Sequence, residues 1–137
     1  PIAINRGNPK AALKQLASEG EDRLNDGLWV LIFPEGTRVP YGQMGKFSRG
    51  GAAMAVNAGL PVLPIAHNAG KCWPRDTWIK QPGTIQIVVG APMYAEGSGP
   101  RAIAELNERA YHWVRERQIE LGALPADAAM VSSTAEE

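Results

Sequence analysis

Leu28-Trp29-Val30-Leu31-Ile32-Phe33, followed directly by Pro34-Glu35-Gly36-Thr37-Arg38, is the stretch that indicates how this chain folds. Six apolar residues without alternation are typical of a central strand that is buried on both faces of a parallel sheet. Pro34 ends that strand, because proline cannot donate to a sheet ladder. Ligands of such sheets bind at the carboxyl ends of the strands, so Pro34 to Arg38 are expected at a binding edge.

The pattern on either side predicts helices that alternate with strands. Asn8-Pro9 is typical of a helix start, and the helix should end at Asn25-Asp26-Gly27. A short buried helix closed by Gly59 and an amphipathic covering helix over 100–121 are also expected. The remaining predicted strands are 2–4, 62–66 and 84–89. The sequence therefore predicts an α/β layered fold with a mostly parallel sheet and flanking helices.

The length and composition fit one domain. The chain has 137 residues, 45% of them hydrophobic, which is enough for a single core. We expect the domain to occupy 1–121 and the Ala-, Ser- and acid-rich residues 122–137 to be a disordered tail. The sequence starts without Met inside an apolar segment, which suggests a fragment. The single Cys72 excludes an internal disulfide and fits a reducing compartment.

The net charge is zero, but the middle of the chain is basic. Residues 36–80 carry six basic side chains and one acidic, whereas 81–137 carry four basic and eight acidic. Charge alone would favour solvated loop residues, and only the motif at Glu35 to Arg38 favours an anionic ligand. Nucleic acid is not an expected partner, because the basic residues lie in loops between buried strands and match no recognition motif.

Glu35-Gly36-Thr37-Arg38 has the composition of a phosphate-binding loop. An arginine can hold two phosphate oxygens, glycine lets backbone amides approach an anion, and threonine adds a hydroxyl. Lys46 and Arg49 follow in a Gly-rich segment that leads into the short helix, whose N-terminus would face the same anion. A nucleoside triphosphate site is not supported, because the P-loop spacing is absent.

The order of these motifs resembles that of the lysophosphatidic acid acyltransferase family, also called the glycerolphosphate acyltransferase-like superfamily. Phe33 to Arg38 resembles its third signature block. The other similar segments are 2–6 (second block), 45–55 (the segment after the third block), 60–65 (fourth block), and 67–70, 73–74 and 82–85, which are similar to the bacterial branch. The resemblance extends from about residue 2 to residue 120.

This resemblance implies transfer of a fatty acyl group from acyl-CoA or acyl carrier protein to 1-acylglycerol-3-phosphate (lysophosphatidic acid), which gives phosphatidic acid. It implies no cofactor besides the acyl donor and no metal. The expected location is the cytoplasmic face of the inner (plasma) membrane, peripheral or tethered by segments outside this chain. Residue by residue, it implies phosphate binding by Arg38, Arg6 and Lys46, and shaping of the acceptor site by Glu35, Gly36 and Thr37. Glu35 would act by holding Arg38 or a glycerol hydroxyl.

One block of the family has no counterpart here, namely a His followed by four residues and an Asp. In the family this His is the general base and the Asp orients it. Five positions after His67 lies Cys72, and five after His112 lies Arg117. We therefore expect the catalytic pair upstream of Pro1 and this chain to be inactive alone. The alternative is a non-catalytic domain that binds phospholipid or CoA phosphate.

Other chemistry-bearing residues favour structural roles. His67 is expected to be held by backbone groups in a loop. A hydrolase triad of Ser48, His67 and Glu35 is not supported, because Ser48 lacks the Gly-x-Ser-x-Gly elbow. Trp73 and Trp78 lie in a basic loop, where they are equally consistent with a membrane interface and with packing onto the domain.

Overall fold

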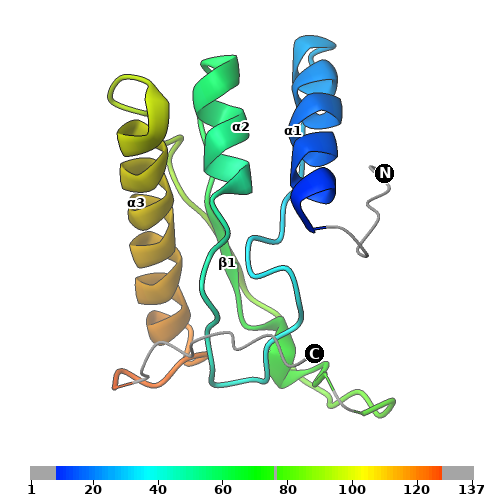
Figure 1. Ribbon diagram of the computed structural model, residues 1–137. Helices are drawn as coiled ribbons and strands as arrows, with labels where there is room; N and C mark the ends of the chain where they lie inside the picture. The colour runs from blue at the N-terminus through cyan, green and yellow to red at the C-terminus, as the bar shows by residue number, and fades with distance from the viewer. Residues whose placement is uncertain (1–8, 76, 128–137) are drawn as a thin grey trace.

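The computed structural model describes residues 9–75 and 77–127, which form helices in a row beside a small sheet. In chain order the elements are α1 (Pro9–Asn25), α2 (Gly50–Ala58), β1 (Ile65–His67), a 3-10 helix (Ala69–Lys71), β2 (Ile87–Val89) and α3 (Gly99–Glu120). Figure 1 shows α2 between α1 and α3, with β1 running beside them. The predicted helices are thus confirmed within about two residues at their ends.

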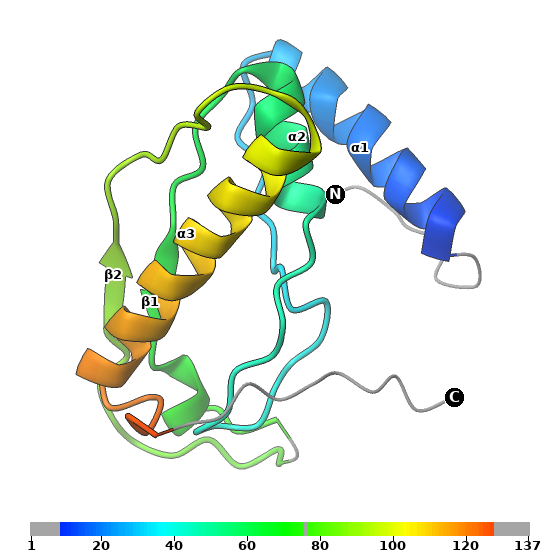
Figure 2. The ribbon, with the colours of Figure 1, turned by 60° about the vertical axis from the view of Figure 1, so that its left-hand side comes forward.

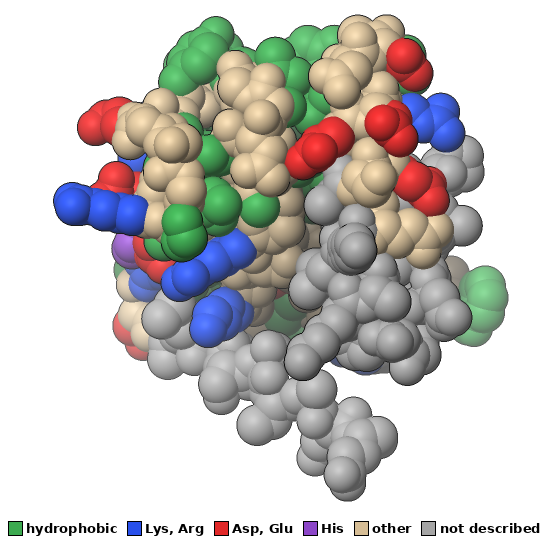
Figure 3. All heavy atoms as spheres, turned by 45° about the horizontal axis from the view of Figure 1, so that its top comes forward, with side chains coloured by type: hydrophobic (Ala, Val, Ile, Leu, Met, Phe, Trp, Pro, Cys, Tyr) green, Lys and Arg blue, Asp and Glu red, His purple; other side chains and the backbone are tan. Residues whose placement is uncertain are grey.

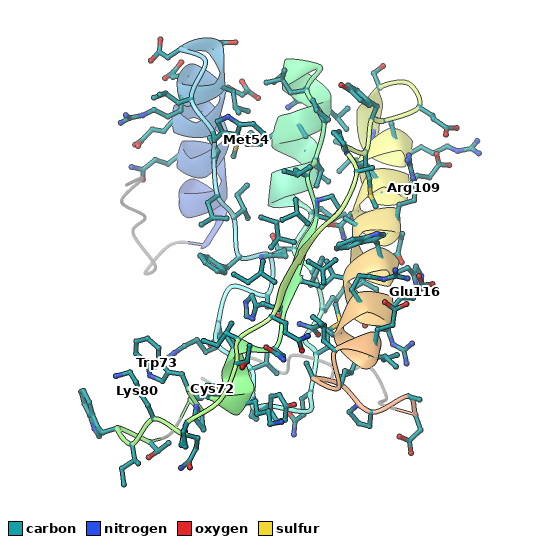
Figure 4. All side chains as sticks on the ribbon, turned by 180° about the vertical axis from the view of Figure 1, so that it is seen from behind. Met54, Cys72, Trp73, Lys80, Arg109 and Glu116 are labelled. Carbon is teal, nitrogen blue, oxygen red and sulfur yellow. The ribbon has the colours of Figure 1, made fainter. Side chains whose placement is uncertain are left out.

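Close approach of α1 and α2 depends on a glycine. Gly20 of α1 is buried, and a Cβ atom at this position would overlap the sulfur and terminal methyl of Met54. Met54 is itself 2% exposed and extends from α2 toward α1 (Figure 4). Glycine in a helix interior is normally unfavourable, so its presence here is explained by packing.

The sheet is an antiparallel pair. Ile65 pairs with Val89, and His67 with Ile87. The pairing continues beyond the strands through an isolated bridge between Val62 and Met93, whose amides and carbonyls exchange hydrogen bonds of 2.9 and 2.8 Å. The strand predictions at 62–66 and 84–89 are therefore correct in place, although the paired segments are shorter.

The expected central strand at 28–33 does not form. These residues have no regular secondary structure, and Trp29 is 86% and Phe33 70% exposed. Residues 28–32 line an apolar cleft of about 650 Å³, and residues 60–65 also line it. A strand requires a neighbour about 4.8 Å away, and no described segment occupies that place. The mostly parallel sheet is accordingly not confirmed, since the pair present in the described residues is antiparallel.

The core consists of two hydrophobic clusters that share α3. Leu106, 1% exposed, packs with Ala52 and Ala55 of α2. The second cluster comprises Met44, Phe47, Ala66, Tyr111, Val114 and Leu124. Charged side chains of both signs lie on the outside of the helices, with hydrophobic side chains exposed between them (Figure 3). Within the described residues, no helix has the length and apolar composition needed to span a membrane.

The packed part of the chain extends past the predicted domain boundary at residue 121. Ala123 is 8% and Leu124 3% exposed, and Leu124 belongs to the second cluster. The Tyr41 hydroxyl also donates a 2.6 Å hydrogen bond to the Gly122 carbonyl. The predicted tail therefore does not begin at Gly122, and its remainder at 128–137 lies outside the described residues.

Replacement of Gly20 by alanine tests the helix contact. Alanine should stabilise an isolated helix by about 1 kcal/mol, yet Gly20→Ala is expected to destabilise this protein by about 1–3 kcal/mol, because the new methyl overlaps Met54. Urea unfolding measures the difference. Ser18→Ala, at an exposed position of α1, is the matched control and should be neutral or stabilising. In a Met54→Ala background the penalty should disappear, and a penalty that persisted there would contradict the contact.

Candidate functional site

The predicted phosphate loop is a tight turn. Gly36 has a φ of 69°, a left-handed conformation that glycine adopts without strain. Its amide donates a 3.0 Å hydrogen bond to the Phe33 carbonyl, which closes the turn. Thr37 and Arg38 follow directly and are exposed. The glycine therefore serves the turn that presents these two side chains.

Glu35 joins this turn to the segment ten residues downstream. Its half-buried carboxylate accepts a 2.7 Å hydrogen bond from the Gly45 amide. The Pro34 carbonyl accepts a second bond, 2.8 Å long, from the Ser48 amide. Burial raises the pKa of the Glu35 carboxyl above its ordinary value near 4.5, and the bond from Gly45 lowers it by a smaller amount. Glu35 thus fixes the loop through the Gly45 amide, and no ion pair joins it to Arg38 among the described residues. A contact of Glu35 with a glycerol hydroxyl, the other role that the resemblance implies, stays a prediction.

Two basic residues, Arg38 and Lys46, adjoin a contact between Val39 and Gly45. A Cβ atom on Gly45 would lie 3.3 Å from a Val39 methyl, so the neighbours of Arg38 and Lys46 touch. Both basic side chains are exposed, and neither has an ion pair or hydrogen bond to another described residue. Guanidinium and ammonium groups are both suited to binding phosphate oxygens.

Not all predicted ligands can be placed. Arg6 lies outside the described residues. Arg49 is the N-cap residue of α2. The Gly50 amide donates a 3.3 Å hydrogen bond to the Ser48 hydroxyl, so that amide is already occupied. Whether other amides of this helix end face the anion stays a prediction.

The three side chains of the hydrolase triad considered from the sequence, Ser48, His67 and Glu35, make hydrogen bonds to backbone amides. The Ser48 hydroxyl accepts a hydrogen bond from the Gly50 amide, and the Glu35 carboxylate accepts one from the Gly45 amide. The Nδ1 atom of His67 accepts a 3.2 Å hydrogen bond from the Ala69 amide, which confirms a histidine held by the backbone. The three side chains are therefore engaged in separate structural bonds.

Phe47 is a residue of the site that the sequence did not reveal. Its ring is 8% exposed and meets the Tyr111 ring edge-on, with centroids 5.2 Å apart. Its carbonyl accepts a 3.4 Å hydrogen bond from the Asn107 side chain. Phe47 therefore anchors the Lys46 side of the loop to α3. The available signal was an aromatic residue in an otherwise polar, Gly-rich loop.

The chain belongs to the acyltransferase family. Residues 1–68 match the family model described as "Acyltransferase", and this range contains the turn at Glu35 and the loop to Ser48. The matched range therefore includes the loop that carries Arg38 and Lys46.

Named relatives give the comparison more detail. The chain is 68% identical over 124 residues to the 1-acyl-sn-glycerol-3-phosphate acyltransferase of Pseudomonas aeruginosa, over 90% of this chain and 48% of that protein. It is 30% identical over 116 residues to the human 1-acyl-sn-glycerol-3-phosphate acyltransferase alpha, over 81% of this chain and 40% of the relative.

A solved structure agrees with these relatives. The crystal structure of the 1-acyl-sn-glycerophosphate (LPA) acyltransferase PlsC from Thermotoga maritima superposes with a TM-score of 0.69 at 29% identity, covering 82% of this chain and 44% of that one. The chain therefore spans about half the length of the bacterial relatives it matches.

The pH dependence of stability should report the burial of Glu35. Because its pKa is raised in the folded state, its contribution to stability is fully present below its unfolded pKa and is lost as the pH rises through the folded value. Glu35→Gln keeps an acceptor for the Gly45 amide and cannot ionise. The free energy of unfolding of this variant should fall less than that of the wild type as the pH rises from about 4 to 7. If the free energy of unfolding changed with pH in parallel for the two proteins, Glu35 would not be the cause of the pH dependence.

Proposed function

We propose that the protein containing this chain is a 1-acylglycerol-3-phosphate O-acyltransferase. It would move a fatty acyl group from acyl-CoA or acyl carrier protein to lysophosphatidic acid and so form phosphatidic acid. The 68% identity to the Pseudomonas enzyme over most of this chain supports this reaction. Activity is proposed for the whole protein, because this chain covers about half the length of that relative.

The role proposed for this chain is to hold the phosphate of the acceptor. The observation that carries it is the pair of exposed basic side chains, Arg38 and Lys46, on a loop that Glu35 and Gly45 hold closed. A phosphate needs cations in fixed positions, and a loop tied by internal hydrogen bonds supplies them with little loss of freedom on binding. We assign Arg6 to the same phosphate by resemblance, and Thr37 and Gly36 to the shape of the acceptor site.

The chemistry is an exchange of a thioester for an ester. The free hydroxyl oxygen of the acceptor attacks the thioester carbonyl carbon, forming a C–O bond and breaking the C–S bond. The hydroxyl proton passes to a general base, and the leaving thiolate takes up a proton to become a thiol. The phosphate loop would position the acceptor for this attack. A metal or redox cofactor is not needed to balance the reaction.

We assign the general base to residues outside the described part of this chain. His67 is engaged with the Ala69 amide, and His112 is exposed on α3 beside Glu108, 3.6 Å away. Neither is followed at five positions by an aspartate that could orient it. We therefore place the His-x4-Asp pair elsewhere in the parent protein.

We infer further that residues 28–33 complete a mostly parallel sheet in the whole protein. Leu28, Trp29, Leu31 and Phe33 are exposed here, and residues 28–32 line a cleft together with residues 60–65. Exposed aromatic side chains in a row are uncommon in a finished domain and indicate a surface that another segment covers.

The substrate and product are lipids, so we place the reaction at the cytoplasmic face of the inner membrane.

The Arg38→Ala substitution in the full-length protein tests the phosphate loop. Loss of a charge-assisted contact should lower kcat/KM for lysophosphatidic acid about ten- to a hundredfold, mainly through a higher KM. Arg101→Ala, which removes an arginine that is 92% exposed on α3, is the matched control and should leave the kinetics unchanged. Wild-type kinetics for Arg38→Ala would rule out the loop as the phosphate site.

The 137-residue chain alone tests the location of the base. Because the chain offers no His-Asp pair at the required spacing, purified chain should show no acyl transfer from acyl-CoA to lysophosphatidic acid above the uncatalysed rate. The chain should still bind lysophosphatidic acid, as measured by calorimetry, if the loop holds the phosphate. Turnover by this chain would mean that the base lies within it.

A further inference from the structure

The connection between β1 and β2 forms a separate projecting loop. It runs from the 3-10 helix after β1 to residue 85 and extends beyond the helices at one end of the molecule (Figures 1 and 2). Asn68, 5% exposed, fastens its base: its side chain accepts a 2.8 Å hydrogen bond from the Gln86 amide and donates one of 3.2 Å to the Gln86 side chain. The loop is therefore tied to the sheet where it starts and ends.

A second closure defines the tip. The Gln81 amide donates a 2.8 Å hydrogen bond to the Cys72 carbonyl, so the described residues 73–75 and 77–80 form the tip beyond this bond. Cys72 is buried below it. Within the tip, the Ile79 amide donates a 3.0 Å bond to the Thr77 hydroxyl. These bonds indicate a defined loop rather than an open excursion.

The tip presents large apolar side chains to solvent. Trp78 is 100% and Ile79 70% exposed, and Trp73 is 57% exposed. Packing of these side chains onto the domain, one of the two roles consistent with the sequence, is therefore not what the structure shows. Exposed tryptophan and isoleucine at the end of a projection would be costly in water and indicate a partner that covers them.

Positive charge accompanies the apolar tip. Lys80 Nζ lies 4.4 Å from the centre of the Trp73 ring, and the two side chains lie together at the projecting end in Figure 4. Lys71 is exposed at the foot of the loop. Counting Arg75, residues 71–80 contain three basic residues and a single acidic one, Asp76. Tryptophan beside lysine is the combination that suits the boundary between lipid headgroups and acyl chains.

The loop base also touches the segment that carries the phosphate site. A Cβ atom on Gly70 would lie 3.2 Å from the Tyr41 ring, and Tyr41 belongs to the segment between Arg38 and Lys46. A membrane contact at the tip would therefore lie at the same end of the molecule as the candidate site. A lipid acceptor could then reach the site without leaving the membrane surface.

We propose that the tip, residues 73–75 and 77–80, docks this chain on a bilayer that contains anionic phospholipid. Trp78 and Ile79 enter the interfacial region, while Lys71 and Lys80 contact headgroup phosphates. The choice of a lipid surface over a protein partner rests on the charge complementarity and on the isolated apolar tip, whose area is small for a stable protein interface. The proposal rests on the proposed function only in that the acceptor and product of the reaction are membrane lipids.

Vesicle sedimentation of the full 137-residue chain tests the apolar tip. Trp78→Ala/Ile79→Ala should lower the partition coefficient on vesicles of phosphatidylcholine mixed with phosphatidylglycerol about tenfold or more, because two buried apolar side chains are removed from the interface. Tyr94→Ala, which removes an aromatic ring that is 61% exposed before α3, is the matched control and should bind as the wild type does. Both sites are exposed, so the fold should persist, as circular dichroism can check.

Charge variants test the lipid class. Lys71→Ala/Lys80→Ala should weaken binding to the mixed vesicles about fivefold for each cation removed. On vesicles of phosphatidylcholine alone, the same variant should match the wild type. Equal loss on both kinds of vesicle would overturn the headgroup contact.

Quenching by brominated phospholipid identifies the inserted tryptophan. Trp29 and Trp78 are both highly exposed, so both single Trp→Phe variants are required. Loss of quenching in Trp78→Phe, with quenching kept in Trp29→Phe, would support insertion of the tip. Quenching lost only in Trp29→Phe would place the contact at the 28–33 segment and overturn the proposal.

The vesicle-binding experiments can fail independently of the acyl-transfer experiments that test the proposed function. Vesicle binding requires no turnover, and turnover of lysophosphatidic acid in detergent micelles requires no bilayer. Wild-type vesicle binding by Trp78→Ala/Ile79→Ala would overturn the docking proposal even if the full-length protein is active. A change in the oligomeric state of that variant without lipid, with unchanged vesicle binding, would assign the tip to a second copy of the chain instead.

Discussion

The apolar face of α3 contacts both hydrophobic clusters, and the other elements depend on this contact. Toward its N-terminal end, Leu106 packs with the small side chains of α2. Further along, Tyr111 and Val114 pack with Phe47 from the loop and Ala66 from β1. Because helix, loop and strand meet on one surface, the position of each is set by how it covers α3. The helix α1 is attached differently, through its contact with α2, and β2 is attached through its pairing with β1.

The packing against α3 also sets the position of the candidate site. Phe47, buried against Tyr111, fixes one side of the loop, and Glu35 connects the other side to it through the Gly45 amide. Such an arrangement leaves Arg38 and Lys46 on a rigid support while their charged ends stay in water. The half-buried Glu35 carboxylate is hydrogen-bonded to the Gly45 amide and so can hold the backbone of the loop in place. Arg38 and Lys46 have to remain accessible, because they must contact a ligand.

Residues 28–33 show that a local apolar pattern does not by itself produce a strand. The run of apolar residues is a strong strand signal. A β-strand nevertheless has no hydrogen-bonding partners within itself, so it exists only where a neighbour lies alongside. Helices differ because their backbone bonds are internal, which explains why α1, α2 and α3 were located closely while the central strand was not.

By itself, the sequence determined the helices, the two short strands and the family, because these depend on local spacing and on consecutive residues. It also predicted Arg38 and Lys46 as phosphate ligands, since phosphate chemistry restricts the choice of side chain, and that role stays a prediction. Only the tertiary structure decided that Glu35 binds Gly45, that Gly20 makes room for Met54, and that Trp78 projects into solvent. These facts arise from contacts between segments, where partner and distance are set by packing and leave no periodic signal along the chain.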